Sequence, residues 1–277
     1  MLWKVNLIKE WEKAAMLCIW DWQLCRQLVI INFIAKKKGE TAVKIKHILF
    51  DLDGTLLPMK QDEFVEYYLP LLAERFVDRG ILQKEFIGYI WKGFAAMVAN
   101  DGSCTNEEVF WKCFQENLPF SREELVRDTI DFYGGDFNKA IHATQPTLVS
   151  GEIIRAAKEK GIQVYLATNP VFPRVATMNR IRWAGLRAED FRIITIYENY
   201  CYCKPNTKYY EEILKEFALN PEECLMVGND VEDDLAAGKL GIKTYLVTDC
   251  VENKKNLPIT ADYTGSLKDC LAFVKEI

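Results

Sequence analysis

Residues 47–57, His-Ile-Leu-Phe-Asp-Leu-Asp-Gly-Thr-Leu-Leu, constrain the fold of this chain more than any other stretch. The apolar residues that end at Phe50 have the composition of a buried strand. Asp51 and Asp53 follow at alternate positions, and side chains two residues apart on an extended segment point to the same side. Gly54 then permits a sharp turn. A buried strand that ends in two converging carboxylates predicts a metal and nucleophile site.

Length and composition limit the class of protein. The chain has 277 residues, enough for one large domain or for a domain with an insertion. Its net charge of −5 argues against nucleic acid or an anionic membrane as partner, and we expect neither. The nine cysteines are odd in number and contain no Cys-x-x-Cys pair. This usage favours a reduced, cytoplasmic protein over a disulfide framework.

Residues 1–44 differ from the rest of the chain and are interpreted as an N-terminal extension. Their uninterrupted apolar part, residues 27–35, is too short to span a bilayer. An amphipathic helix packed on the domain and a helix on a membrane surface are two alternatives. A third is that the segment is non-native or dispensable, since the chain from Val43 onward reads as an ordinary beginning.

Residues 59–146 have a helical pattern throughout. Two segments begin with a capping box, in which Thr105 precedes Glu108 and Ser121 precedes Glu124 by three residues. The stretch predicts a bundle of about four helices, which is a natural inserted unit.

From residue 147 onward, helices alternate with short apolar strands. The expected strands are residues 163–167, 191–196, 224–227 and 244–247. This alternation predicts an α/β fold, with a doubly wound, Rossmann-like parallel sheet built from residues 45–58 and 147–277 and a helical cap inserted between them. Ligands bind at the carboxyl ends of such strands. Polar residues follow three of these ends: Asp51, Asp53, Thr168, Asn169, Asn229 and Asp230.

The residue types at these strand ends suit phosphate chemistry with Mg²⁺, which prefers oxygen ligands. The chain has only two histidines, His47 and His142, so a histidine-based zinc site is excluded. Lys204, just before a predicted helix, is placed to neutralise Asp51 and a bound phosphate together. Thr168 offers a hydroxyl group to phosphate oxygens.

Four segments, in this order, resemble the haloacid dehalogenase-like hydrolases. They are Asp51-Leu52-Asp53-Gly54-Thr55, Leu166-Ala167-Thr168-Asn169, Lys204-Pro205, and the acidic segment from Val227 to Asp234. The resemblance covers most of residues 45–250 and rests most strongly on the first segment. It implies that the helical insertion is a cap of the C1 type, which closes over small soluble substrates.

The resemblance also implies roles for the residues. Asp51 would be the nucleophile, and Asp53 would protonate the leaving oxygen and then activate water. The substrate phosphate would be held by Thr168, Asn169, Lys204 and Gly54.

The metal ligands implied by the resemblance are Asp51, the backbone carbonyl of Asp53, and an acid of the fourth segment. The family commonly has Gly-Asp where this chain has Gly228-Asn229. Register places Asn229 at the ligand position, whereas counting back four residues from Asp234 places Asp230 there. We expect Asp230 to bind the metal, with Asn229 as a neutral alternative and Asp234 as an orienting acid near Lys204.

In this family, an acid two residues after the nucleophile is typical of phosphatases and phosphomutases. We therefore expect Mg²⁺-dependent hydrolysis of a small phosphorylated metabolite. A sugar-phosphate mutase and a non-catalytic ligand-binding protein are the alternatives, and the substrate and oligomeric state are left open.

Overall fold

The computed structural model describes residues 44–116 and 118–277, and residues 45–277 form one compact unit. The interpretation of the N-terminal extension concerns residues that, apart from Lys44, lie outside these ranges. Within the described ranges, no helix combines the length and the apolar character needed to cross a membrane.

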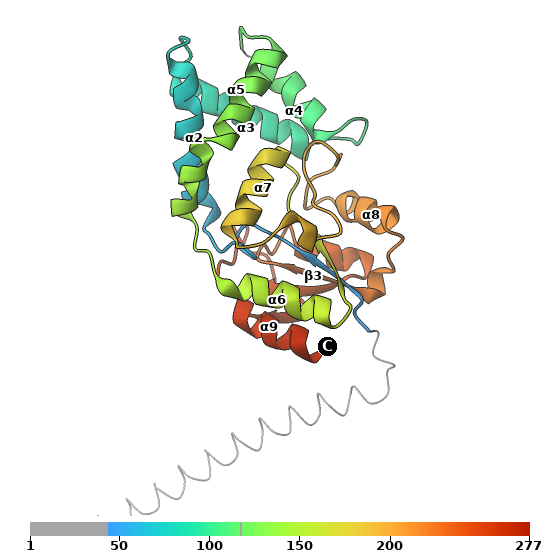
Figure 1. The fold of residues 1–277 in the computed structure, drawn as a ribbon. Coiled ribbons are helices and arrows are strands. Elements are labelled where there is room, and N and C mark those ends of the chain that lie inside the picture. The colour runs from blue at the N-terminus through green and yellow to red at the C-terminus, as the bar shows by residue number, and fades with distance from the viewer. Residues whose placement is uncertain (1–43, 117) are drawn as a thin grey trace, which may run out of the picture. The chain divides into compact units, whose positions relative to one another are not determined.

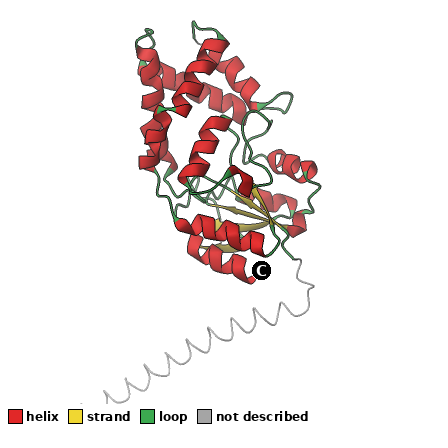
Figure 2. Cartoon of the chain, viewed as in Figure 1, coloured by secondary structure: helices red, strands yellow, loops and turns green. Residues whose placement is uncertain are grey.

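A five-stranded parallel sheet lies at the centre of this unit (Figure 2). Its strands, in spatial order, are β2 (Gln163–Leu166), β1 (His47–Phe50), β3 (Cys224–Gly228), β4 (Lys243–Val247) and β5 (Tyr263–Gly265). Phe50 at the end of β1 pairs with Leu166 on one side and Val227 on the other. The carboxyl ends of three strands therefore stop at one level, and the residues that follow them form a single row.

Helices cover both faces of the sheet. They are α6 (Leu148–Glu159), α7 (Arg174–Trp183), α8 (Thr207–Glu216) and α9 (Leu267–Glu276), with the short 3-10 helices η2 (Ala188–Asp190), η3 (Pro221–Glu223) and η4 (Leu235–Leu240). Ile48 and Phe50 join an apolar cluster with side chains of α6 and α9, while Leu49 joins a second cluster with side chains of α8. Alternate residues of β1 thus face opposite layers, which confirms the doubly wound α/β prediction.

A helical layer is inserted between β1 and α6 and stands above the sheet in Figure 1. It consists of α2 (Gln61–Val77), α3 (Gln83–Val98), α4 (Asn106–Gln115), α5 (Arg122–Gly134) and the 3-10 helix η1 (Asp136–Ala143). Both predicted capping boxes are confirmed, because Thr105 and Ser121 each exchange two hydrogen bonds with the glutamate three residues on. The boundaries of the cap at residues 59 and 146 stay a prediction.

Aromatic side chains fill the interior of this layer. The rings of Phe76 and Phe86 stack with centroids 4.2 Å apart, and those of Phe110 and Phe114 stack at 5.2 Å. Trp111 is buried among them. Such packing stabilises the layer by burying a large apolar area, so these rings form the core of the helical layer.

The strand predicted over residues 191–196 is wrong. The segment makes a single bridge, between Leu166 and Ile194, beside the edge strand β2. Amides of Arg192 and Thr195 donate to β2 carbonyl oxygens, but the chain turns away before a ladder develops. The outer strand β5 on the other edge was not predicted.

Candidate active site

Asp51 and Asp53 lie in the turn that follows β1, at the carboxyl edge of the sheet. The amide of Asp51 donates to the carbonyl oxygen of Val227 at 2.9 Å, so strand-like pairing continues to the first acid. Gly54 has a φ of 84°, and a Cβ at this position would lie 2.4 Å from Nδ2 of Asn229. A side chain here would meet both the strained backbone and this neighbour, so the turn requires glycine.

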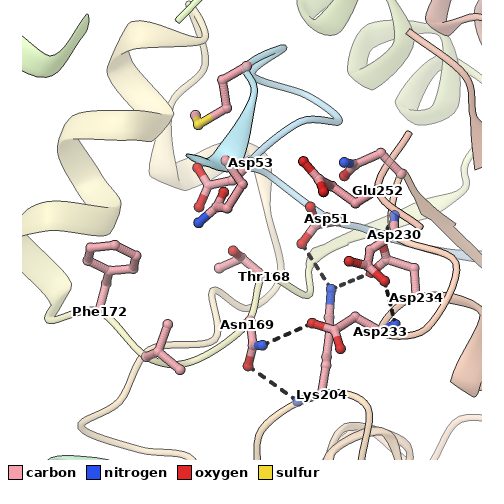
Figure 3. A pocket seen from close by; sticks show the side chains of 14 residues that line it. Asp51, Asp53, Thr168, Asn169, Phe172, Lys204, Asp230, Asp233, Asp234 and Glu252 are labelled. Atoms are coloured by element: carbon pink, nitrogen blue, oxygen red, sulfur yellow. Dashed lines mark hydrogen bonds and ion pairs between the residues drawn. The ribbon is translucent and has the colours of Figure 1, made fainter. Parts of the chain in front are cut away.

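Lys204 is the buried cation of the site, with only 2% of its surface exposed. Its Nζ donates to Oδ1 of Asp51 at 2.9 Å and to Oδ1 of Asp234 at 2.6 Å (Figure 3). Burial lowers the pKa of Lys204, but the charges of Asp234 and Asp51 outweigh that effect and raise it well above its ordinary value. Lys204 is therefore a fixed positive charge between two acids.

The acids around Lys204 outnumber it. Burial raises the pKa of Asp51 to about 8, although the charge of Lys204 opposes this rise. Burial, followed by repulsion from Asp230 and Asp234, raises the pKa of Asp233 to about 7. Because one lysine does not offset these carboxylates, an added cation would stabilise their ionised forms.

The loop after β3 is shaped by its own acids. The amide of Asp230 donates to Oδ2 of Asp234 at 2.9 Å. In turn, Oδ1 of Asp230 accepts from the amides of Glu232 and Asp233 at 2.7 and 2.8 Å. Asp234, 1% exposed, thus contacts both Lys204 and the loop, whereas these bonds leave the second carboxylate oxygen of Asp230 for a ligand.

Asn229 links two loops at the edge of the sheet. Its Oδ1 accepts from Oγ1 of Thr55 at 2.9 Å, and its Nδ2 donates to the carbonyl oxygen of Cys250 at 2.7 Å. Asn229 and Asp230 both line the pocket described below, so the structure brings both alternative metal ligands to the site.

Thr168 and Asn169 follow β2 and form the opposite wall. Thr168 is 2% exposed, and its carbonyl oxygen accepts from the hydroxyl of Tyr209 at 3.0 Å. Oδ1 of Asn169 accepts from the amide of Lys204 at 3.2 Å, and Nδ2 donates to Asp233 at 3.2 Å. The Asn169 side chain therefore joins the loops that carry Lys204 and Asp233.

Arg180, in α7, is a site residue that sequence reasoning missed. Its guanidinium forms an ion pair with Oδ2 of Asp53, donates to Oγ1 of Thr177 at 3.2 Å and lies 4.0 Å from the centre of the Phe172 ring. Arg180 is fully buried. Oδ1 of Asp53 is also buried, and among the described residues it finds no hydrogen-bond partner. No residue pattern around Arg180 indicates this role, because its contact with Asp53 depends on which face of α7 packs against the edge of the sheet.

Glu252, in the loop after β4, was also missed. Its amide donates to the carbonyl oxygen of Asn229 at 3.0 Å, and its carbonyl oxygen accepts from the amide of Val231 at 2.9 Å. These bonds hold Glu252 beside the acidic loop. No sequence pattern around Glu252 indicated this, because the contact arises from two loops of neighbouring strands.

Fourteen residues line a pocket of about 160 Å³ at this edge of the sheet. Six carboxylates take part: Asp51, Asp53, Asp230, Asp233, Asp234 and Glu252. Lys204, Thr168, Asn169, Asn229 and Gln61 complete its polar wall, and Met59, Val171 and Phe172 form its apolar part. Every predicted site residue except Gly54 lines the pocket, and Gly54 lies against Asn229 in its wall.

The sequence model of the haloacid dehalogenase-like hydrolase family matches residues 45–241, more than half of the chain. The chain belongs to the haloacid dehalogenase-like hydrolases. Its sequence is 26% identical over 240 residues to a phosphoglycolate phosphatase from Vibrio vulnificus (strain YJ016), covering 86% of this chain and 97% of the relative. With such relatives, this hydrolase is of the phosphatase type.

Two solved structures share the fold of this hydrolase. One is a HAD phosphatase from Thermococcus onnurineus, with 19% identity, a TM-score of 0.54, and coverage of 83% of this chain and 98% of that chain. The other is the HAD-hydrolase YfnB from Bacillus subtilis bound to magnesium, with 18% identity, a TM-score of 0.51, and coverage of 84% and 100%.

Proposed function

We propose that this hydrolase cleaves a small phosphate monoester with Mg²⁺, through an aspartyl-phosphate on Asp51. The observation that carries the proposal is the position of Lys204, whose Nζ bonds both Asp51 and Asp234 inside the pocket. A lysine ammonium has three donors, so one remains for a phosphate oxygen. Lys204 can therefore hold a phosphoryl group beside the attacking carboxylate.

The proposed reaction has two steps. In the first, an Oδ of Asp51 attacks phosphorus, the bond from phosphorus to the ester oxygen breaks, and Asp53 gives that oxygen a proton. In the second, Asp53 takes a proton from water, whose oxygen attacks phosphorus, and the bond to Asp51 breaks to release inorganic phosphate. Thr168 and Lys204 hold the phosphoryl oxygens throughout and stabilise the charge that they carry.

The donors in the pocket fit Mg²⁺, because they are carboxylate and amide oxygens. Among the described residues, no three Asp, Glu, His or Cys side chains converge as a ready-made metal cage. Mg²⁺ commonly binds to one or two carboxylates, with water and substrate oxygens completing its shell. We infer that Asp51, the carbonyl of Asp53 and the uncommitted oxygen of Asp230 would hold the ion, which would offset the charge of the transferred phosphoryl group.

The volume of the pocket limits the substrate. Pockets that hold drug-sized ligands measure roughly 300–1,000 Å³, whereas this one measures about 160 Å³. We infer that this volume suits a phosphoryl group with a short alcohol.

The test is release of inorganic phosphate from p-nitrophenyl phosphate with and without Mg²⁺, using Asp51→Asn and, as control, Asp131→Asn on the exposed face of α5. We expect Asp51→Asn to lose at least about 10³-fold in kcat, because the nucleophile is removed. The control should match the parent. Equal activity of Asp51→Asn and the parent would overturn the proposal, and phosphate transfer to a sugar phosphate without release would identify a mutase instead.

A further inference from the structure

We propose that the alcohol portion of the substrate is uncharged or carries an amine, and that esters bearing a second anionic group are disfavoured. This inference rests on the proposed phosphatase function and narrows its substrate class.

The pocket wall is strongly acidic. Six carboxylates line it, and among the lining side chains that the structure describes, Lys204 is the single cation. Two of the three ammonium donors of Lys204 go to Asp51 and Asp234, which leaves one for the phosphate. The ion pair with Arg180 offsets the charge of Asp53, and Lys204 with one divalent ion offsets three more, which leaves two of the six carboxylate charges without a cation. A carboxylate or second phosphate on the substrate would therefore enter without a cation to receive it.

Arg180 does not supply the missing charge, although it lies near the pocket. It is fully buried, forms its ion pair with Asp53 and packs on the ring of Phe172. Phe172 lines the pocket and Arg180 does not. Arg180 acts as a positioning residue for Asp53 and does not contact the substrate.

Lys254 and Lys255, in the loop that follows Glu252, form ion pairs outside the pocket. Nζ of Lys254 pairs with Asp62 at 2.6 Å, and Nζ of Lys255 pairs with Glu232 at 2.6 Å. Neither lysine lines the pocket.

Glu252 is the carboxylate that would contact an amine on the substrate. The loop bonds to Asn229 and Val231 fix its backbone, and Figure 3 shows its carboxylate pointing into the pocket beside Asp51, on the side away from Lys204. An ammonium group on the substrate would meet this carboxylate once the phosphate is held by Lys204. Met59, Val171 and Phe172 add an apolar part to the wall, and the amide of Gln61 can bond a hydroxyl group.

The first test compares three esters with the same two-carbon chain: ethanolamine phosphate, 2-hydroxyethyl phosphate and phosphoglycolate. We expect kcat/KM for each of the first two to exceed that for phosphoglycolate at least tenfold. Equal or higher kcat/KM for phosphoglycolate would overturn the inference. Calorimetric binding of the same esters to Asp51→Asn with Mg²⁺ separates this failure from that of the proposed function, since it measures the preference without turnover. Tighter binding of phosphoglycolate there would overturn the inference as well.

The second test changes the charge at the proposed contact. Glu252→Lys should raise the ratio of kcat/KM for phosphoglycolate to that for ethanolamine phosphate at least tenfold, and Glu252→Gln should raise it less. Glu232→Gln is the matched control, because Glu232 pairs with Lys255 outside the pocket, and its ratio should equal that of the parent. Calorimetry should give the same Mg²⁺ Kd for Glu252→Gln and the parent. Weaker Mg²⁺ binding with an unchanged ester ratio would make Glu252 a metal ligand and overturn the inference.

Discussion

The carboxyl edge of the sheet and the inserted helical layer bury their side chains in opposite ways. At the edge, Lys204 and Asp234 are buried charges that pair with each other. In the helical layer, the buried side chains are mainly apolar or aromatic, as in the stacked pair Phe76 and Phe86. The edge therefore holds the reactive groups at the expense of desolvation, whereas the layer supplies apolar stabilisation and contributes Gln61, the first residue of α2, to the pocket wall.

Asn106 connects the two regions. It is fully buried at the start of α4, and its Nδ2 donates to the carbonyl oxygen of Pro170 at 3.1 Å and to Sγ of Cys203 at 3.3 Å. Pro170 follows Thr168 and Asn169, and Cys203 precedes Lys204. A helical-layer residue thus contacts both loops that hold phosphate in the proposed mechanism.

The largest effect is expected at the edge. Lys204→Met should lower kcat/KM by about 10³-fold or more, because it removes the cation beside Asp51 and leaves two buried acids unpaired. It should also lower the free energy of unfolding by about 3–5 kcal/mol. Phosphate-release kinetics and urea unfolding measure the two effects. Lys208→Met, on the exposed face of α8, is the control. Activity within tenfold of the parent would show that the edge does not depend on its cation.

Affinity for Mg²⁺ should depend strongly on pH, because six carboxylates line the pocket at the edge. The pKa of Asp51 is raised to about 8 and that of Asp233 to about 7, so both acids hold protons at pH 6 and lose them as pH rises. Proton release must precede metal binding, so the Kd should fall by about 10- to 100-fold between pH 6 and pH 9. Calorimetric titration at fixed ionic strength measures this change. A Kd that is flat with pH would contradict the raised pKa values.

Arg180→Met tests whether Arg180 holds the general acid, Asp53, in position for the reaction. Without the ion pair, Asp53 loses its fixed position, and we expect kcat to fall by about 10- to 100-fold with KM within about threefold. Arg182→Met, on the exposed side of the same helix, should leave kcat unchanged. If KM rises while kcat is maintained, Arg180 serves substrate binding and not the position of Asp53.

The smallest effect is expected where the two regions meet. Asn106→Ala should lower kcat/KM about tenfold and the free energy of unfolding by about 1–3 kcal/mol, because three buried hydrogen bonds are lost, two of them to the phosphate loops. Asn100→Ala, which removes a bond to Asn106 but no bond to the phosphate loops, should lower stability with little change in kcat/KM. Equal kinetic losses in both variants would show that the layer acts on the site only through overall stability.

The site residues that could be predicted from the sequence are those that directly follow a strand of the sheet. Asp51 and Asp53 alternate after a strand, and Thr168 and Asp230 follow neighbouring strands, so the parallel register alone brings them to one edge. Arg180 and Glu252 escaped prediction because their contacts depend on which helix face and which loop pack against that edge. The segment over residues 191–196 has strand-like composition, but its pairing is limited by the turn that follows it.

The most direct test of Asp51 as the nucleophile is mass spectrometry of the acid-quenched enzyme during turnover of p-nitrophenyl phosphate with Mg²⁺. We expect the peptide containing Asp51 to carry one phosphoryl group, and we expect this adduct to be absent from Asp51→Asn and present in Asp131→Asn. Burst release of p-nitrophenol should accompany the adduct wherever its hydrolysis limits turnover. Phosphate release by the parent enzyme with no phosphoryl group on Asp51, under a quench that preserves an acyl phosphate standard, would contradict the role of Asp51 as nucleophile.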